Sequence, residues 1–252
     1  MSDYPSPEFF LASLLTAYPG VDFLNELDSL LPVLAARTEP EAQSLYSHLR
    51  AFEPEALQIW QSNYIDLFDR GQAQNPIYET EYGRNRAISK STELADLAGF
   101  YQAFGLSNEG LPEMHDHISV ELEFYGYLLL KEAWLKEQGE TEGVEIVAEA
   151  RAKFLQGHLA AFAQALPACE GIQSHSLYLA IFTWVAELVK IECLKQEIQP
   201  DPLHYFSQEQ EPEEMNCSVL GGCQSVRSEV VNGAENAGEL PLRSFNPEKV
   251  RI

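Results

Sequence analysis

Basic residues are scarce in this 252-residue chain. It carries 16 lysines and arginines against 39 aspartates and glutamates, which gives a formal net charge of −23 at pH 7. A surface this acidic repels phosphate backbones and anionic lipid headgroups, so nucleic acid and negatively charged membranes are poor partners for it. A basic peptide would be attracted, although high net charge also serves solubility alone.

Cysteine and long apolar runs are also in short supply. The four cysteines are too few for a disulfide scaffold at this length, and we expect Cys169 and Cys193 to be buried thiols. Cys217 and Cys223 alone would make a poor closed zinc site. No uninterrupted apolar segment is long enough to span a bilayer, and the N-terminus lacks the basic region of a secretory signal. We therefore expect a cytoplasmic protein without membrane insertion.

Several enzyme signatures are missing from the sequence. The chain has no Gly-x-Gly-x-x-Gly, no phosphate-binding glycine loop ending in lysine, no Gly-x-Ser-x-Gly and no His-Glu-x-x-His. Paired Glu-x-x-His elements, which di-iron helical bundles require, are absent as well. The chain is therefore expected to be no enzyme, with no catalytic residue and with no cofactor or metal of its own.

Apolar residues recur at three- and four-residue steps along most of the chain up to residue 199, a period that predicts helices. The expected fold class is all-α, with a single helical-bundle domain over residues 1–199. The predicted helices span about 6–18, 23–31, 39–49, 53–68, 91–104, 116–136, 142–166 and 174–199. Pro32 is expected to end the second helix. The last helix is apolar nearly all round, which predicts a central place in the bundle.

Two stretches break the helical pattern. Residues 71–86 contain glycine, asparagine and proline and are interpreted as an ordered surface loop. Residues 200–252 are polar and poor in large apolar side chains, so they cannot bury enough surface to offset the entropy of ordering. We expect this second stretch to be an acidic, polar C-terminal tail of low order.

Ionisable side chains are densest from Glu113 to Glu121. Asp116 stands where an N-cap would accept hydrogen bonds from the first free amides of the next helix. His117 and Glu121 are four residues apart and share a helix face. His115 and His117 would diverge on a helix, which disfavours a metal site. A metal site, a structural cap and a peptide-recognition site all remain open at this point.

Aromatic residues gather in the same half of the chain. They are Trp60, Tyr64, Phe68, Tyr78, Tyr82, Phe100, Tyr101 and Phe104. Most such side chains pack in a core. Tyr78 and Tyr82 lie in the predicted loop, where ordered aromatics more often serve recognition.

Three short patches in fixed order carry a resemblance to a known family. They are Tyr64-x-x-Leu67-Phe68, Pro76-Ile77-Tyr78-Glu79, and Glu113-Met114-His115-Asp116-His117 leading into Glu121-Leu122-Glu123-Phe124. Over roughly residues 60–128 this series resembles the TorD/DmsD/NarJ family of redox-enzyme maturation chaperones. His115 stands where the family usually has proline, and Ile77 interrupts the usual Pro-Pro-Tyr-Glu.

The resemblance implies an all-helical cytoplasmic chaperone that is not an enzyme. Its partner would be the apo catalytic subunit of a molybdopterin oxidoreductase, held in some cases by its basic twin-arginine leader until the client's molybdenum cofactor is inserted. The client-binding residues that it implies are Tyr64, Leu67, Phe68, Pro76, Tyr78, Glu79, Glu113, Asp116, His117 and Glu121. The carboxylates among them would pair with arginines of the leader, while a hydrophobic groove would take its apolar stretch.

Two other functions stay open from the sequence. One is a metal-binding protein or enzyme that uses His115 and His117. The other is an acidic helical adaptor for an unrelated basic protein. No motif specifies which oxidoreductase is the client, whether that client has a leader, or the oligomeric state.

Overall fold

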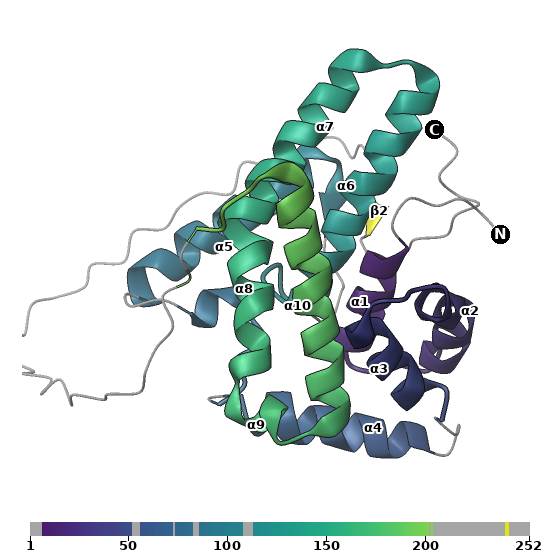
Figure 1. The fold of residues 1–252 in the computed structure, drawn as a ribbon. Coiled ribbons are helices and arrows are strands. Elements are labelled where there is room, and N and C mark those ends of the chain that lie inside the picture. Colours follow the sequence, from purple (N-terminus) through teal and green to yellow (C-terminus); the bar gives the residue numbers. More distant parts are fainter. Residues whose placement is uncertain are drawn as a thin grey trace, which may run out of the picture.

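The computed structural model describes residues 7–51, 56–72, 74–82, 86–107, 113–201, 203 and 240–241, and this part of the chain is largely helical (Figure 1). The α-helices are α1 Glu8–Thr16, α2 Phe23–Ala35, α3 Pro40–Leu49, α4 Leu57–Tyr64, α5 Arg86–Ala103, α6 Ile118–Gln138, α7 Thr141–Phe154, α8 Ala160–Ala165, α9 Glu170–Gln173 and α10 Ser176–Gln196. Short turns of other helix types are η2 Ile65–Asp69, η3 Glu79–Glu81, η4 Leu155–Leu159 and η5 Leu166–Ala168. A two-residue strand β1, Leu106–Ser107, pairs in parallel with β2, Leu240–Pro241. The all-α fold predicted from the sequence is confirmed.

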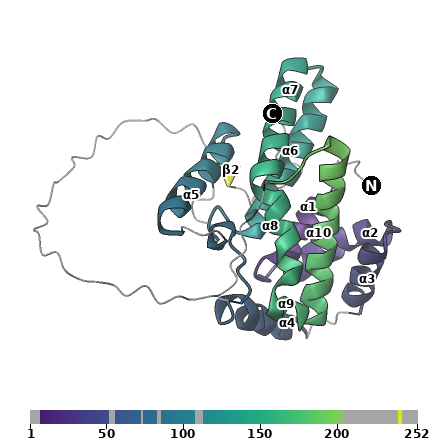
Figure 2. The same cartoon turned by 60° about the vertical axis from the view of Figure 1, so that its left-hand side comes forward.

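Helix α6 forms the centre of the core. Its residues 118–126 are buried on every side, because α1 and α7 both pack along it. Gly126 allows the close approach of α1, since a Cβ at this position would lie 3.0 Å from the Cβ of Phe9. Beyond this region α6 and α7 form a hairpin that extends past the rest of the bundle in both views (Figures 1 and 2).

Helix α10 also lies within the bundle. It contacts α8, α3, α9 and α1, and its buried side chains include Tyr178, Phe182 and Val185. Figure 2 shows α8 and α10 side by side along the middle of the molecule. The central place predicted for this helix is confirmed.

Two helix boundaries differ from the prediction. Helix α2 continues through Pro32 to Ala35, so the expectation that Pro32 ends it is wrong. Proline lacks only its own N–H, and the Pro32 carbonyl still accepts from the Ala36 N–H at 3.2 Å. The helix also continues because Leu34, after the proline, is fully buried in the core. The helices predicted over 53–68 and 142–166 each contain a π-helical turn, η2 and η4, which adds a residue that a 3.6-residue period cannot show.

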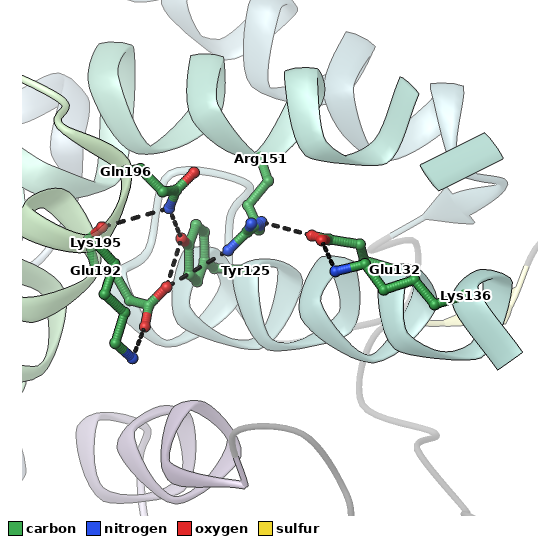
Figure 3. A network of polar contacts seen from close by, with 7 residues as sticks. All are labelled: Tyr125, Glu132, Lys136, Arg151, Glu192, Lys195 and Gln196. Carbon is green, nitrogen blue, oxygen red and sulfur yellow. Dashed lines mark hydrogen bonds and ion pairs between the residues drawn. The ribbon is translucent and has the colours of Figure 1, made fainter. Parts of the chain in front are cut away.

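A network of polar side chains connects α6, α7 and α10 (Figure 3). The Arg151 guanidinium of α7 lies 3.0 Å from a Glu132 carboxylate oxygen of α6 and 3.5 Å from a Glu192 carboxylate oxygen of α10. The Tyr125 hydroxyl donates to Glu192 at 3.3 Å and accepts from the Gln196 amide at 2.8 Å. Three helices are therefore joined through one cation whose side chain is 14% exposed.

The predicted division of the chain at residue 199 remains a prediction. Of the expected tail, residues 200, 201, 203, 240 and 241 are described. Asp201 accepts from the Gln156 amide at 3.2 Å, so the chain just after α10 is still attached to the bundle.

Candidate functional site

The three motif patches lie against one another in the fold. The Glu79 amide donates to the Asp116 carbonyl at 2.8 Å, and the Ile118 amide donates to the Ile77 carbonyl at 3.2 Å. These bonds hold the 76–82 loop on the segment that leads into α6. The ordered loop predicted from the sequence is thus attached through its backbone.

Asn75 fixes the start of the same loop. Its side-chain amide donates to the Leu67 carbonyl at 3.1 Å, and its side-chain carbonyl accepts from the Ile172 amide at 3.0 Å. One buried side chain thereby ties the loop both to η2 and to α9. The signal in the sequence is an asparagine directly before a proline, which is typical of a turn.

His117, and not Asp116, is the N-cap of α6. Its Nδ1 accepts from the Ser119 amide at 3.1 Å, while its Nε2 lies 3.1 Å from the Tyr64 hydroxyl. Because Nδ1 acts as an acceptor, the neutral ring carries its proton on Nε2. The prediction that Asp116 caps the helix is wrong, since its carboxylate accepts instead from the hydroxyl and the amide of Thr80.

Aromatic rings lead from the buried cap to the surface. The Tyr64 ring lies 5.5 Å from the ring of Tyr18, and the Tyr78 ring lies 5.0 Å from the ring of His117. The Tyr78 hydroxyl donates to the Glu113 carboxylate at 2.9 Å. Burial, and then the Glu113 charge, raise the pKa of Tyr78, so this hydroxyl stays protonated and remains a donor. Tyr78 and Glu113 are partly exposed and form the outer end of the site.

Three carboxyl groups lie beneath this surface. Asp116 and Glu121 are 0% exposed, and Glu79 is 6% exposed. Within the described part of the chain, both oxygens of Glu121 and one oxygen of Asp116 have no hydrogen-bond partner. Burial first, and the charges of Glu79 and Asp116 second, raise the pKa of Glu121 well above its ordinary value. The site therefore favours a neutral Glu121.

His158 belongs to the same site and was missed in the sequence analysis. From η4 it places Nδ1 3.0 Å from the Glu79 carboxylate and Nε2 3.1 Å from the Asp96 carboxylate of α5. Burial alone would lower the pKa of His158, but the two carboxylates outweigh it and raise the pKa. Its only signal in the sequence is a histidine within an apolar helix, which does not reveal the π-helical turn that orients it.

The predicted site residues divide into two groups by exposure. Those partly exposed are Leu67, Pro76, Tyr78 and Glu113. Those buried are Tyr64, Phe68, Glu79, Asp116, His117 and Glu121. All ten lie on the mutually packed patches, but only Glu113 among the carboxylates reaches solvent. Their contact with a client stays a prediction.

Other candidate residues from the sequence have simpler positions. Tyr82 is buried and donates to the Pro76 carbonyl at 2.9 Å, and its expected recognition role stays a prediction. His115 stacks on Tyr101 at 5.5 Å, and burial lowers its pKa. Cys169 and Cys193 are buried free thiols, as predicted.

The metal interpretation gains no support from the described residues. They contain no group of three or more His, Cys, Asp or Glu side chains placed to hold a metal ion. The other two cysteines, Cys217 and Cys223, fall outside the part of the chain that the structure describes.

The all-helical fold thus carries a packed 76–82 loop and a partly exposed pair formed by Tyr78 and Glu113. Residues 32–167, more than half of the sequence, match the family model described as nitrate reductase delta subunit. The chain belongs to this family, which comprises NarJ/TorD-type chaperones of molybdoenzyme maturation. No curated protein matches the chain. Among the described helices, none is both long and apolar enough to cross a membrane.

Glu121→Gln tests the buried acid. The raised pKa means that the folded state binds the Glu121 proton more tightly than the unfolded state does, so stability is lost as pH rises from the ordinary pKa of 4.5 through the folded value. The neutral amide removes this loss, so we expect the variant to be more stable than the unchanged chain at pH 8. The pKa of His158 is also raised in the folded state, so its contribution to stability is likewise lost as pH rises through that pKa.

Urea unfolding of both chains at pH 5 and pH 8 checks this expectation. The variant should gain most at pH 8 and little at pH 5. An equal change at both pH values would show that Glu121 is not held neutral by its surroundings.

Proposed function

We propose that this protein binds the apo catalytic subunit of a nitrate reductase-type molybdenum oxidoreductase in the cytoplasm and holds it until the molybdenum cofactor is inserted. The observation that carries the proposal is the assembly of the three family patches into one site that opens to solvent at Tyr78 and Glu113. Where the client is exported, the same binding would delay export. The chaperone needs no cofactor of its own, because the molybdenum cofactor belongs to the client.

The partly exposed pair Tyr78 and Glu113 is suited to a cationic side chain of the client. A guanidinium stacked on the Tyr78 ring would receive a cation–π contact and could donate to the Glu113 carboxylate. Lysine lacks the planar fork, so arginine is the better fit. This interpretation assigns the first contact with a basic leader to Glu113.

An apolar surface adjoins the aromatic end of the site. Tyr18 is 39% exposed and Val21 is 92% exposed, and both lie in the α1–α2 connection, which the Gln61 side chain of α4 holds through the Pro19 carbonyl at 2.9 Å. With the partly exposed Leu67 and Pro76, these side chains offer a surface for the apolar stretch of the client segment. Nothing in the local sequence pattern predicts that Tyr18 lies beside Tyr64.

The net charge supports this assignment through kinetics. A charge of −23 draws a basic segment toward the protein and raises the association rate at low salt. Exposed charges more than a Debye length of ~10 Å apart are screened at 0.1 M salt. Binding through this surface should therefore weaken as ionic strength rises.

Glu113→Gln and Tyr78→Ala test the exposed pair. We expect each change to weaken binding of the client's catalytic subunit about tenfold, since each removes one partner of a charge-assisted or cation–π contact worth ~1–2 kcal/mol. Titration calorimetry with the purified apo subunit measures the loss. Glu149→Gln is the matched control, because Glu149 pairs only with Lys153 in an exposed i,i+4 contact on α7. Unchanged affinity in both site variants would refute the assignment.

A further inference from the structure

The raised pKa of Glu121 keeps this group neutral in the closed structure, but the buried carboxyl oxygens still carry the cost of unmade hydrogen bonds. Desolvating a carboxylate without hydrogen bonds is costly, and buried charges in proteins are normally paired. Glu121 and one oxygen of Asp116 lack any hydrogen-bond partner in the described chain, although they lie in the centre of the fold. Three carboxyl groups from η3, from the segment before α6, and from α6 itself would together match a cation that carries several donors.

Helix α5 covers this cluster. Its Tyr101 is fully buried, lies within electrostatic range of Glu79, Asp116 and Glu121, and donates to the His115 carbonyl at 2.7 Å. Its Phe100 packs on Phe154 at 5.4 Å. In both overall views α5 lies at the edge of the molecule, outside the α6–α10 bundle (Figures 1 and 2).

A chain of three charged side chains, Asp96, His158 and Glu79, holds α5 over the buried carboxyl groups, and we call it the clasp. Asp96 of α5 contacts His158, and His158 contacts Glu79, so the clasp runs from the surface to the buried acids. The Asp96 side chain is 65% exposed and the Glu79 side chain 7%. A cation in solution can therefore compete for the outer member of the clasp without entering the core.

We propose that α5 is a latch over a guanidinium-binding site formed by Glu79, Asp116 and Glu121, which opens when a client arginine displaces the Asp96–His158 contact. This inference rests on the proposed function and extends it, because it gives the buried family carboxylates a ligand. A guanidinium has five N–H donors in a planar fork, enough to satisfy the unpartnered oxygens of Asp116 and Glu121 together. A metal ion is the poorer fit, since the described residues hold no group arranged to ligate one.

The latch follows the rule that a ligand shifts an equilibrium only through its different affinity for the two states. In the closed state an arginine can reach Glu113, whereas in the open state it also reaches three further carboxyl groups. Opening exposes Leu97 and Tyr101 of α5, and that cost keeps the free protein closed. Any change that weakens the clasp alone should therefore favour the ligand.

Asp96→Asn distinguishes the latch from simple surface attraction by the sign of its effect. If Asp96 only attracts cations, its loss weakens binding of a basic peptide. If it closes the latch, its loss strengthens binding by up to about fivefold, the value of a partly exposed ion pair.

The probe is a synthetic peptide with two adjacent arginines and an apolar stretch. Its binding to the full chain is measured by fluorescence anisotropy and compared with that of the same peptide carrying glutamine at both positions. Glu149→Gln again serves as the control.

Carboxyl labelling of the free protein provides an independent measurement. Carbodiimide and glycine ethyl ester, followed by mass spectrometry, should modify Glu79 and Glu121 faster in Asp96→Asn than in the unchanged chain, with Glu149 labelled equally in both. Adding Glu121→Gln to Asp96→Asn should remove the gain in peptide affinity. Unchanged labelling, or weaker peptide binding by Asp96→Asn, would overturn the latch even if the client still binds. Failure of the peptide to bind any variant, with faster labelling in Asp96→Asn, would contradict arginine recognition and leave the opening of α5 established.

Discussion

Arg151→Leu is expected to lower the free energy of unfolding by about 3–5 kcal/mol, the usual cost of removing one partner from a buried ion pair. Glu132 and Glu192 face this guanidinium from α6 and α10, with side chains 10% and 5% exposed. Lys136 and Lys195 neutralise them only in part, because both lysine side chains are more than half exposed to solvent. Without Arg151, two carboxylates remain in the interior with no buried cation between them (Figure 3).

Urea denaturation measures the Arg151 effect. Lys153→Ala, two residues away in the same helix, is the matched control, because its pair with Glu149 is exposed and contributes little to stability. Replacing Glu192 by leucine together with Arg151 should restore part of the loss, since the uncompensated charge is then removed. A loss under about 1 kcal/mol for Arg151→Leu would show that the network does not join the three helices energetically.

The double variant Asp116→Ala/His117→Ala should be destabilised by about 2.5–4 kcal/mol. This sum combines a lost helix cap of about 1 kcal/mol with buried hydrogen bonds to a charged group, which are worth about 1.5–3 kcal/mol. Both side chains are fully buried, and they hold Thr80, Ser119 and Tyr64 in place. Weaker client binding by this variant would therefore follow mainly from a displaced 76–82 loop.

Thermal unfolding and client affinity, measured on the same samples, separate these effects. For a domain of about 150–250 residues, a loss of about 4 kcal/mol corresponds to a Tm lower by roughly 10 °C. Glu113→Gln should instead lose affinity at nearly unchanged Tm, because the side-chain oxygen of glutamine can still accept from the Tyr78 hydroxyl. A double variant with normal Tm and no client binding would mean that Asp116 and His117 contact the client directly.

The helical order of the fold could be predicted from the sequence, because amphipathic periodicity reports burial directly. The site geometry could not be predicted in the same way. Aspartate is a better N-cap than histidine in local terms, yet the contact of Asp116 with Thr80, 36 residues away, leaves the cap to His117. A tertiary contact therefore determines which of two adjacent residues caps the helix.

The burial of the acidic residues is the second feature that local sequence does not reveal. Glu121 and Glu123 at the start of α6 look like a solvated helix face, but α1, the 76–82 loop and Tyr101 of α5 enclose this part of the helix. His158 was missed for a related reason, since a π-helical turn shifts it out of the 3.6-residue register. In each case, residues distant in the sequence determine which charges are covered.

The measurement that tests the central proposal most directly is affinity purification of the tagged, full-length protein from its native cell extract, with bound chains identified by mass spectrometry. The proposal predicts recovery of one molybdopterin-type catalytic subunit without its cofactor, and a reduced yield with Glu113→Gln but not with Glu149→Gln. Recovery of assorted basic proteins at equal yield from all three chains would contradict it and would favour a general acidic adaptor.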